Sequence, residues 1–225
     1  MAGSPMLALQ ELLSKAGMGD GQVPDPLKDT LTVLLDEVGR LKRELDKAKA
    51  RAAHLEKLAD EDALMPVANR RAFMRELSRL VALAQRYGTA SSVVYIDLNG
   101  MKTINDRWGH NAGDAALLHV ARTLIENVRH ADVVARLGGD EFGVLLVRTG
   151  QEAADEKAEA LAEAIEANPL LWNGVSIQLS AAAGAYCFAG AEGVAAALEA
   201  ADRAMYRAKQ VRKTVDQESG QAAVC

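Results

Sequence analysis

Several kinds of residue are scarce in this sequence, and each shortage excludes a class of protein. Its 225 residues include two cysteines, too few for the disulfide framework of a small secreted domain. No apolar run approaches the roughly 18 residues of a membrane-spanning helix, and no basic stretch precedes an apolar one at the start, as a signal peptide requires. Basic residues are fewer than acidic ones, and the resulting net charge of -5 argues against a broad nucleic-acid surface. We therefore expect a cytoplasmic protein without a membrane span and without a nucleic-acid partner.

Two adjacent glycines and two adjacent carboxylates stand between apolar runs in the second half of the chain. The runs at residues 133–135 and 143–147 have the composition of buried strands, so residues 138–141 are predicted to form a tight turn. Glycines let backbone N–H groups approach a ligand that any Cβ would block, and carboxylates offer oxygen ligands to a divalent cation. The pattern indicates a nucleotide site, although a surface hairpin with acidic side chains explains it equally well when it is taken alone.

A further acidic residue follows a second apolar run. Residues 92–96 predict a buried strand, and Asp97 comes where this strand meets its following loop. Ligands in α/β folds gather at the carboxyl ends of strands. If Asp97 and Asp140 converge, they make a carboxylate pair for Mg²⁺, which takes its other ligands from waters and substrate phosphates. Taken alone, a turn-forming role explains Asp97 as well.

Four motifs give the chain its resemblance to a known family. They occupy residues 62–73, 97–106, 108–114 and 138–142. On these motifs, residues 60–213 resemble a GGDEF domain of the diguanylate cyclase family. Departures from the usual pattern of that family occur at Met65, Pro66, Asn99, Gly100, Met101, Arg212 and Lys213.

The resemblance implies both a fold and a reaction. Apolar periodicity predicts helices at 70–87, 153–167 and 194–210 and strand material at 174–189, which indicates α/β or α+β layers. The family implies a palm-like α+β fold whose central, mostly antiparallel sheet is flanked by helices. In the implied reaction, two GTP molecules, one on each subunit of an antiparallel domain dimer, condense into cyclic di-GMP and release two pyrophosphates. The expected cofactor is Mg²⁺, with Mn²⁺ as the alternative.

The resemblance also assigns catalytic roles to single residues. It implies a metal site made by the Asp97 and Asp140 side chains and the Leu98 carbonyl. Asp140 is the usual proton acceptor, but Glu141 and water stay open as alternatives, because a metal-bound carboxylate is a poor base. Lys102 would stabilise the transition state as a point charge near the phosphates. A solvated lysine on a short helix is the alternative reading of that residue.

Substrate binding involves a second set of residues. Gly138 and Gly139 would let the backbone close on the phosphates. Asn105 and Asp114 are similar to the family's guanine-reading residues, and an amide with a carboxylate suits the donors and acceptors of that base. Asp114 also precedes an apolar-periodic segment, so a role as a helix N-cap is its alternative.

The last predicted helix ends in a cluster of cations. The family ends this helix with a Lys and, four residues on, a Gly-Arg pair, and both cations hold the terminal phosphates of GTP. Lys209 matches the first cation. Arg212 and Lys213 stand where Gly and Arg are usual, so either Lys213 contacts phosphate without a bidentate fork or Arg212 takes over that contact. Cations that favour a helix C-terminus are the alternative that needs no substrate.

An Arg-x-x-Asp quartet ends eight residues before Asp140 and consists of Arg129, two intervening residues and Asp132. It resembles the family's product-inhibition site, where cyclic di-GMP binds. Arg129 would fork to phosphate or stack on guanine, and Asp132 would accept from the Watson–Crick edge of guanine. A salt bridge at a helix exit is the alternative.

The first 59 residues differ from the rest in composition and in the spacing of their apolar residues. Residues 1–26 predict a short helix and a breaker-rich linker, and residues 27–59 carry apolar side chains in alternating steps of four and three. Charges that flank this seam have opposite signs in a parallel pair, so we expect a parallel, homodimeric coiled-coil stalk. A single helix packed on the domain is the alternative. The seam residues are Leu31, Leu34, Val38, Leu41, Leu45, Ala48, Ala52 and Leu55.

The catalytic domain is expected to span residues 60–215 and to be followed by a flexible tail at 216–225. A sensor is the expected partner of the N-terminal segment. One function of another class stays open: a degenerate GGDEF domain that binds GTP or cyclic di-GMP and acts as a regulatory interaction module.

Overall fold

The chain divides into two units, Met1–Ala59 and Asp60–Cys225, which we describe separately. The computed structural model describes residues 14–15, 17, 24–189 and 193–222, and the described side chains exclude those of 53–58 and 211–222. The predicted helix in the first 16 residues therefore lies almost wholly outside the described residues. Within them, no helix is both long and apolar enough to cross a membrane.

The first unit is dominated by the helix α2, Asp25–Asp60, whose last residue belongs to the second unit. Leu34, Val38, Leu41 and Leu45 of the predicted seam are each more than half exposed. Exposed leucines and valines at heptad spacing are typical of a helix that buries them against a second helix. The stalk and its dimer remain predictions.

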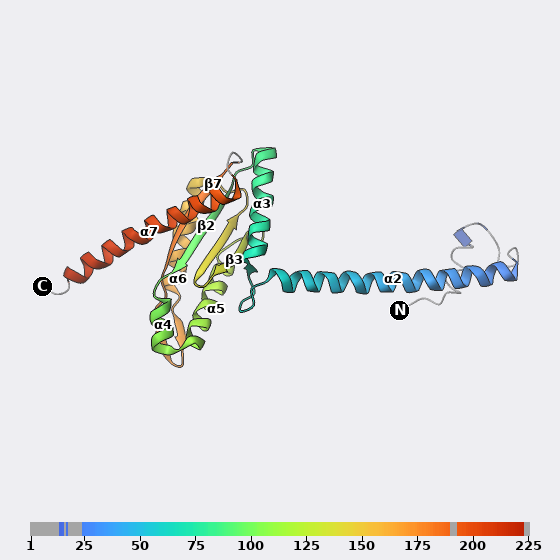
Figure 1. The fold of residues 1–225 in the computed structure, drawn as a ribbon, viewed down its shortest axis with the longest axis horizontal. Coiled ribbons are helices and arrows are strands. Elements are labelled where there is room, and N and C mark those ends of the chain that lie inside the picture. Colours follow the sequence, from blue (N-terminus) through green and yellow to red (C-terminus); the bar gives the residue numbers. More distant parts are fainter. Residues whose placement is uncertain (1–13, 16, 18–23, 190–192, 223–225) are drawn as a thin grey trace. The chain divides into compact units, whose positions relative to one another are not determined.

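The second unit is built on a five-stranded sheet in the order β1-β3-β4-β2-β7 (Figure 1). The β1 and β3 strands run parallel, and the other neighbours pair antiparallel, as predicted for a mostly antiparallel sheet. A two-stranded sheet of β5 and β6 lies outside it. The strands are β1 (Ala68–Asn69), β2 (Ser91–Leu98), β3 (Val133–Gly138), β4 (Glu141–Leu146), β5 (Leu170–Trp172), β6 (Val175–Ile177) and β7 (Ala181–Phe188).

Helices cover both faces of this sheet, so apolar side chains of alternate strand residues enter two separate cores. In β2, Val94, Ile96 and Leu98 pack with α4, α5 and α6, whereas Val93 and Tyr95 pack with α3 and α7. We call these the α4–α5 face and the α3–α7 face. The helices are α3 (Arg70–Tyr87), α4 (Met101–Trp108), α5 (His110–Glu126), α6 (Gln151–Ala167) and α7 (Val194–Ala222).

The predicted helices are present, with differences at their ends. The predicted bounds of α3 are confirmed, because the Asn69 side chain caps its first turn and accepts from the Ala72 N–H at 3.0 Å. The α7 helix continues past its predicted end at 210, to Ala222, through part of the expected tail. It crosses β7 closely, since a Cβ on Gly184 would collide with the α7 backbone at Ala204 and Met205.

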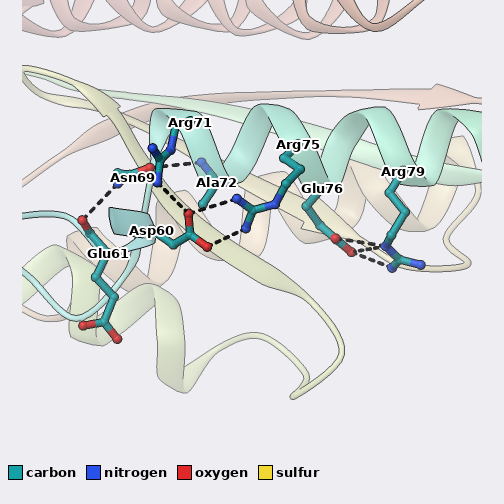
Figure 2. Close-up of polar contacts among 8 residues, drawn as sticks. All are labelled: Asp60, Glu61, Asn69, Arg71, Ala72, Arg75, Glu76 and Arg79. Carbon is teal, nitrogen blue, oxygen red and sulfur yellow. Dashed lines mark hydrogen bonds and ion pairs between the residues drawn. The ribbon is translucent and has the colours of Figure 1, made fainter. Parts of the chain in front are cut away.

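The segment that joins α2 to α3 is held by polar contacts with α3 (Figure 2). Asp60, the last residue of α2, accepts from the Arg75 guanidinium at 2.9 and 2.6 Å and from Arg71 at 3.1 Å. The Arg75 hydrogen bonds lower the pKa of the Asp60 carboxyl to about 2. One residue on, the Glu61 carbonyl accepts from the Asn69 side chain at 3.1 Å. These bonds hold both ends of the nine-residue connection at 61–69.

Candidate active site

The end of β2 meets the turn between β3 and β4, so the two acidic segments predicted to converge lie side by side. Asp97 is the direct cross-strand partner of Glu141. Next to it, the Leu98 N–H donates to the Asp140 carbonyl at 3.1 Å. The N–H and C=O of one residue in an extended strand face the same neighbour, so the Leu98 carbonyl also faces the turn. Asp97 itself lies inside β2 and not in the following loop.

The turn is shaped by a glycine and an arginine. Gly139 has a φ of 51°, in the left-handed region that favours glycine. Its carbonyl accepts from the Arg136 Nε and Nη2 at 3.0 and 2.8 Å, and Arg136 Nη1 lies 3.5 Å from Asp62 Oδ1. Arg70 donates to the Leu137 carbonyl at 3.2 Å. The start of the domain therefore supports the turn through two arginines, neither of which was predicted.

An open cavity of about 410 Å³ lies beside the turn on the α4–α5 face, and it brings together five residues predicted to act on substrate. These are Lys102, Asn105, Asp114, Gly139 and Asp140. Polar side chains that the sequence analysis did not single out complete the lining. A nucleotide-sized opening with convergent donors and acceptors is the usual form of a ligand site. The other lining residues are Met101, Asp106, His110, Gly113, Leu117 and Arg136.

The candidate guanine-reading pair is held by the start of α5. This helix begins at His110 after Gly109, so Asp114 lies inside it and the N-cap alternative is wrong. The amide of Asn105 packs against Gly113, because a Cβ at that position would collide with the Asn105 side chain. A glycine one residue before Asp114 therefore lets the amide and the carboxylate lie on one wall of the cavity.

The loop from β2 to α4 explains two departures from the family pattern. Gly100 has a φ of 72° and precedes the first residue of α4, where a left-handed conformation favours glycine. Asn99 donates its amide to the Ser180 hydroxyl at 3.3 Å, a bond that an aspartate could not donate. Lys102 is exposed on the first turn of the eight-residue helix α4, at the cavity wall.

On the α3–α7 face, charged groups pack against α7. Lys209 forms an ion pair with Asp97, and the two side chains are 27% and 15% exposed. Tyr95, two residues before Asp97 and on the same face, is the diagonal neighbour of Glu141 across the strand pair. Burial, followed by the influence of the Glu141 carboxylate, raises the pKa of the Tyr95 hydroxyl well above its ordinary range. Lys209 thus reaches the acidic end of β2, and its predicted contact with phosphate stays a prediction.

The oxygen atoms at this corner suit a magnesium ion. Candidate donors are the Asp97, Asp140 and Glu141 carboxylates and the Leu98 carbonyl. Among the described residues, no group of three or more His, Cys, Asp or Glu side chains is arranged to hold a metal, so the protein would supply few ligands. Mg²⁺ usually binds one or two carboxylates and completes its shell with waters and phosphates.

The remaining predicted residues lie outside the cavity lining. Gly138 is exposed at the end of β3. Asp132 accepts from the backbone N–H of Arg129 at 3.0 Å and from that of Val147 at 3.1 Å. Its carboxylate therefore orders the start of β3 through backbone bonds, which differs from the side-chain salt bridge considered as an alternative. The side chain of Lys213 lies outside the described residues, as does that of Arg212.

Comparisons with known proteins agree with these motifs. The family model described as diguanylate cyclase, GGDEF domain, matches residues 59–214. The chain is 38% identical over 183 residues to the diguanylate cyclase DgcP of Pseudomonas aeruginosa, covering 80% of this chain and 27% of that protein. Other curated diguanylate cyclases are covered over 33% and 42% of their lengths, so the chain spans less than half of each of these relatives.

Two solved structures extend the comparison to the fold. The coiled coil and GGDEF domain of DgcB from Caulobacter crescentus, in complex with c-di-GMP, is similar at a TM-score of 0.71 and 24% identity, over 79% of this chain and 94% of that one. The GGDEF domain of DgcB alone, also with c-di-GMP, is similar at a TM-score of 0.64 and 28% identity, over 68% and 88% of the two chains.

Proposed function

The chain belongs to the GGDEF diguanylate cyclase family, and on that premise we propose that it condenses two GTP molecules into cyclic di-GMP. The observation that carries the proposal is the contact between the end of β2 and the Gly139–Asp140 turn, beside a cavity lined by Lys102, Asn105 and Asp114. Metal-ligand candidates and base-reading candidates thereby meet at one edge of the sheet.

Guanine would occupy the wall made by Asn105 and Asp114. The Asp114 carboxylate accepts from the N1–H and N2–H₂ donors of the base, and the Asn105 amide offers both a donor and an acceptor. Asp114 is exposed at the opening, so the base can enter and leave without a movement of the core. An adenine presents a different set of donors there, which gives the site its preference for GTP.

The phosphates would lie over the turn. Asp97, the Leu98 carbonyl and Asp140 would hold Mg²⁺, and the register adds Glu141 to these candidates, because it lies directly opposite Asp97. When bound, Mg²⁺ neutralises phosphate charge and lowers the pKa of the attacking 3′-hydroxyl. Gly139 lets the backbone approach the phosphates, and Asp140 would accept the proton of the hydroxyl.

Cations on two helices would complete phosphate binding. Lys102 lies on the cavity wall and would offset charge that develops in the transition state. Lys209, which pairs with Asp97 in this structure, would contact the terminal phosphates of GTP. Lys213, or Arg212 in its stead, would follow it along α7.

The reaction needs two loaded sites facing each other, so a homodimer is part of the proposal. The exposed seam on α2 supports a parallel stalk that raises the effective concentration of one catalytic domain around the other. Regulation would act through a sensor at the N-terminal segment and through cyclic di-GMP bound at Arg129 and Asp132. The similarity to the DgcB domain solved with c-di-GMP supports product binding. A cytoplasmic location, where GTP is available, is proposed with it.

The test is incubation of the chain with GTP and Mg²⁺, followed by chromatographic detection of cyclic di-GMP and pyrophosphate. We expect both products, and Asp140→Asn should lower the rate at least about 100-fold, as expected for loss of a catalytic acid–base group. Asp155→Asn, a change on the surface of α6, is the matched control and should leave the rate unaltered. GTP binding without turnover would instead identify a regulatory module.

A further inference from the structure

Tyr95 is a buried polar residue on the face of β2 that also carries Val93 and Asp97. It is 7% exposed and belongs to the core cluster that includes Phe73, Leu77 and Met205. A buried hydroxyl costs free energy unless it is hydrogen-bonded, so the phenol needs a partner at this position. A phenylalanine would fill the same space without that requirement. The hydroxyl therefore points to a function beyond packing.

The partner is Glu141, and the strand register explains why the two side chains meet. Asp97 lies opposite Glu141 and Tyr95 lies opposite Gly143, so Tyr95 and Glu141 are diagonal neighbours on one face of an antiparallel pair. The Glu141 carboxylate is the acceptor that this register brings within reach of the Tyr95 hydroxyl, and its influence contributes to the raised pKa of that hydroxyl. Diagonal pairs are within reach of an aromatic and a long side chain.

Gly143 fixes where the tyrosine ring can lie. A Cβ on Gly143 would come within 2.7 Å of the Phe73 ring, so Phe73 fills the space that a side chain at this position would take. Phe73 comes from α3 and is fully buried. Because the residue opposite Tyr95 has no side chain and its place is filled by a rigid ring, Tyr95 has little freedom to move sideways. Its hydroxyl is thus held near the turn.

Charges on both covering helices act on the Tyr95 hydroxyl. Besides Glu141, Asp202 on α7 raises the pKa of Tyr95 and Arg70 on α3 lowers it. Arg70 also donates to the carbonyl of Leu137, beside the glycine turn. A neutral donor at this position can interact with Glu141 without adding a charge to the site.

We propose that Tyr95 is a positioning residue that orients the Glu141 carboxylate for the diguanylate cyclase reaction. The inference rests on the proposed function. A glutamate has three rotatable bonds, and a turn-adjacent glutamate without an anchor would occupy several rotamers. The hydrogen bond engages one part of the carboxylate and leaves its other lone pairs available at the edge occupied by Asp97.

The first test replaces Tyr95 with phenylalanine, which removes the hydroxyl and keeps the ring. We expect kcat to fall roughly 10- to 100-fold with the KM for GTP changed less than about threefold, because misplacement of a reacting group affects the transition state more than substrate binding. Tyr87→Phe is the matched control, since Tyr87 ends α3 and is 63% exposed. It should leave kcat and KM unaltered.

The second test is a double-mutant cycle with Glu141→Ala, read both as kcat and as the urea midpoint of unfolding without nucleotide. If Tyr95 acts through Glu141, the hydroxyl deletion has little further effect in the Glu141→Ala background, in both readouts, because alanine leaves no acceptor. Additive effects in an active chain would overturn the role of Tyr95 and leave the cyclase function standing. A chain that couples the two residues in urea but makes no cyclic di-GMP would refute the proposed function and, with it, the catalytic role of the pair.

Discussion

The two faces of the sheet differ at the glycine turn. On the α4–α5 face, an open cavity is lined by polar groups from α4, from α5 and from the turn itself. On the α3–α7 face, Lys209 of α7 pairs with Asp97, and Tyr95 and Glu141 lie on the same face of β2 and β4. An open wall suits a base that enters and leaves in each cycle. A covered corner suits charges that must keep their positions, because interactions between charges strengthen as water is excluded.

The largest expected effect is on the covered face. Asp97→Asn removes the carboxylate that both Lys209 and the proposed metal would use. A Lewis-acid metal contributes several kcal/mol to the transition state, and about 1.4 kcal/mol is tenfold, so the rate should fall roughly 1,000-fold. Initial rates of cyclic di-GMP formation measure the change, and the paramagnetic signal of free Mn²⁺ measures metal affinity. If the variant keeps a tenth of the activity, Asp97 is not an essential ligand of the proposed metal.

The open face should affect selectivity more than rate. Asp114→Asn keeps the size of the side chain and replaces the acceptor that faces the N1–H and N2–H₂ donors of guanine. A hydrogen bond to a charged group contributes about 1.5–3 kcal/mol, so kcat/KM for GTP should fall roughly 10- to 100-fold. Inosine triphosphate lacks the N2 amine, so the preference for GTP over it should shrink. An unaltered ratio between the two substrates would remove Asp114 from the guanine site.

On the same face, a substitution at Gly113 should have a smaller effect, and it should weaken GTP binding without lowering the stability of the fold. Gly113→Ala puts a Cβ where the Asn105 side chain lies, so the amide must move. Loss of one neutral hydrogen bond corresponds to about 0.5–1.5 kcal/mol, or a two- to tenfold higher KM for GTP. Alanine is also the better helix residue, so the free energy of unfolding should stay level or rise by up to about 1 kcal/mol. A lower KM would contradict the assigned role of Asn105.

The smallest effect is expected away from both faces, at Asp60 (Figure 2). Its pKa is lowered from 3.8 to about 2, so its ionised form contributes stability above pH 4, and this contribution is lost as the pH falls toward 2. Asp60→Asn should lower the unfolding midpoint slightly at pH 7 and lose that difference near pH 2. Thermal melts of both proteins across this range measure it. Parallel curves would mean that the Arg75 contact adds nothing to stability.

The difference between the faces also explains what the sequence could predict. Asn105 and Asp114 lie nine residues apart on successive helices, so a local motif was enough to bring them to one cavity. The end of the strand near Asp97 and the turn at Gly139 were also predicted from short stretches of sequence. The apolar runs beside each of them predict buried strands, so these two segments could be expected to lie in one sheet.

The covered face depends on distant parts of the chain, and the sequence did not reveal it. Lys209 and Asp97 are 112 residues apart, and their pairing depends on how α7 crosses the sheet. Tyr95 was predicted only as part of an apolar strand, because the neighbour of its hydroxyl depends on the register between β2 and β4. The N-cap role considered for Asp114 was wrong, since α5 begins four residues earlier, at His110. Register and helix crossing are tertiary properties that periodicity does not encode.

The bare backbone of Gly184 has a consequence for how this domain can change. Because α7 touches β7 where residue 184 has no side chain, even one added methyl group would lift the helix from the strand. Lys209 lies four residues beyond Met205, the last α7 residue at this contact, and Asp202 lies two residues before Ala204, the first. A substitution at Gly184, which lies opposite Tyr95 in the neighbouring strand, would thus move the charged residues of α7 relative to Asp97 without altering any of those residues.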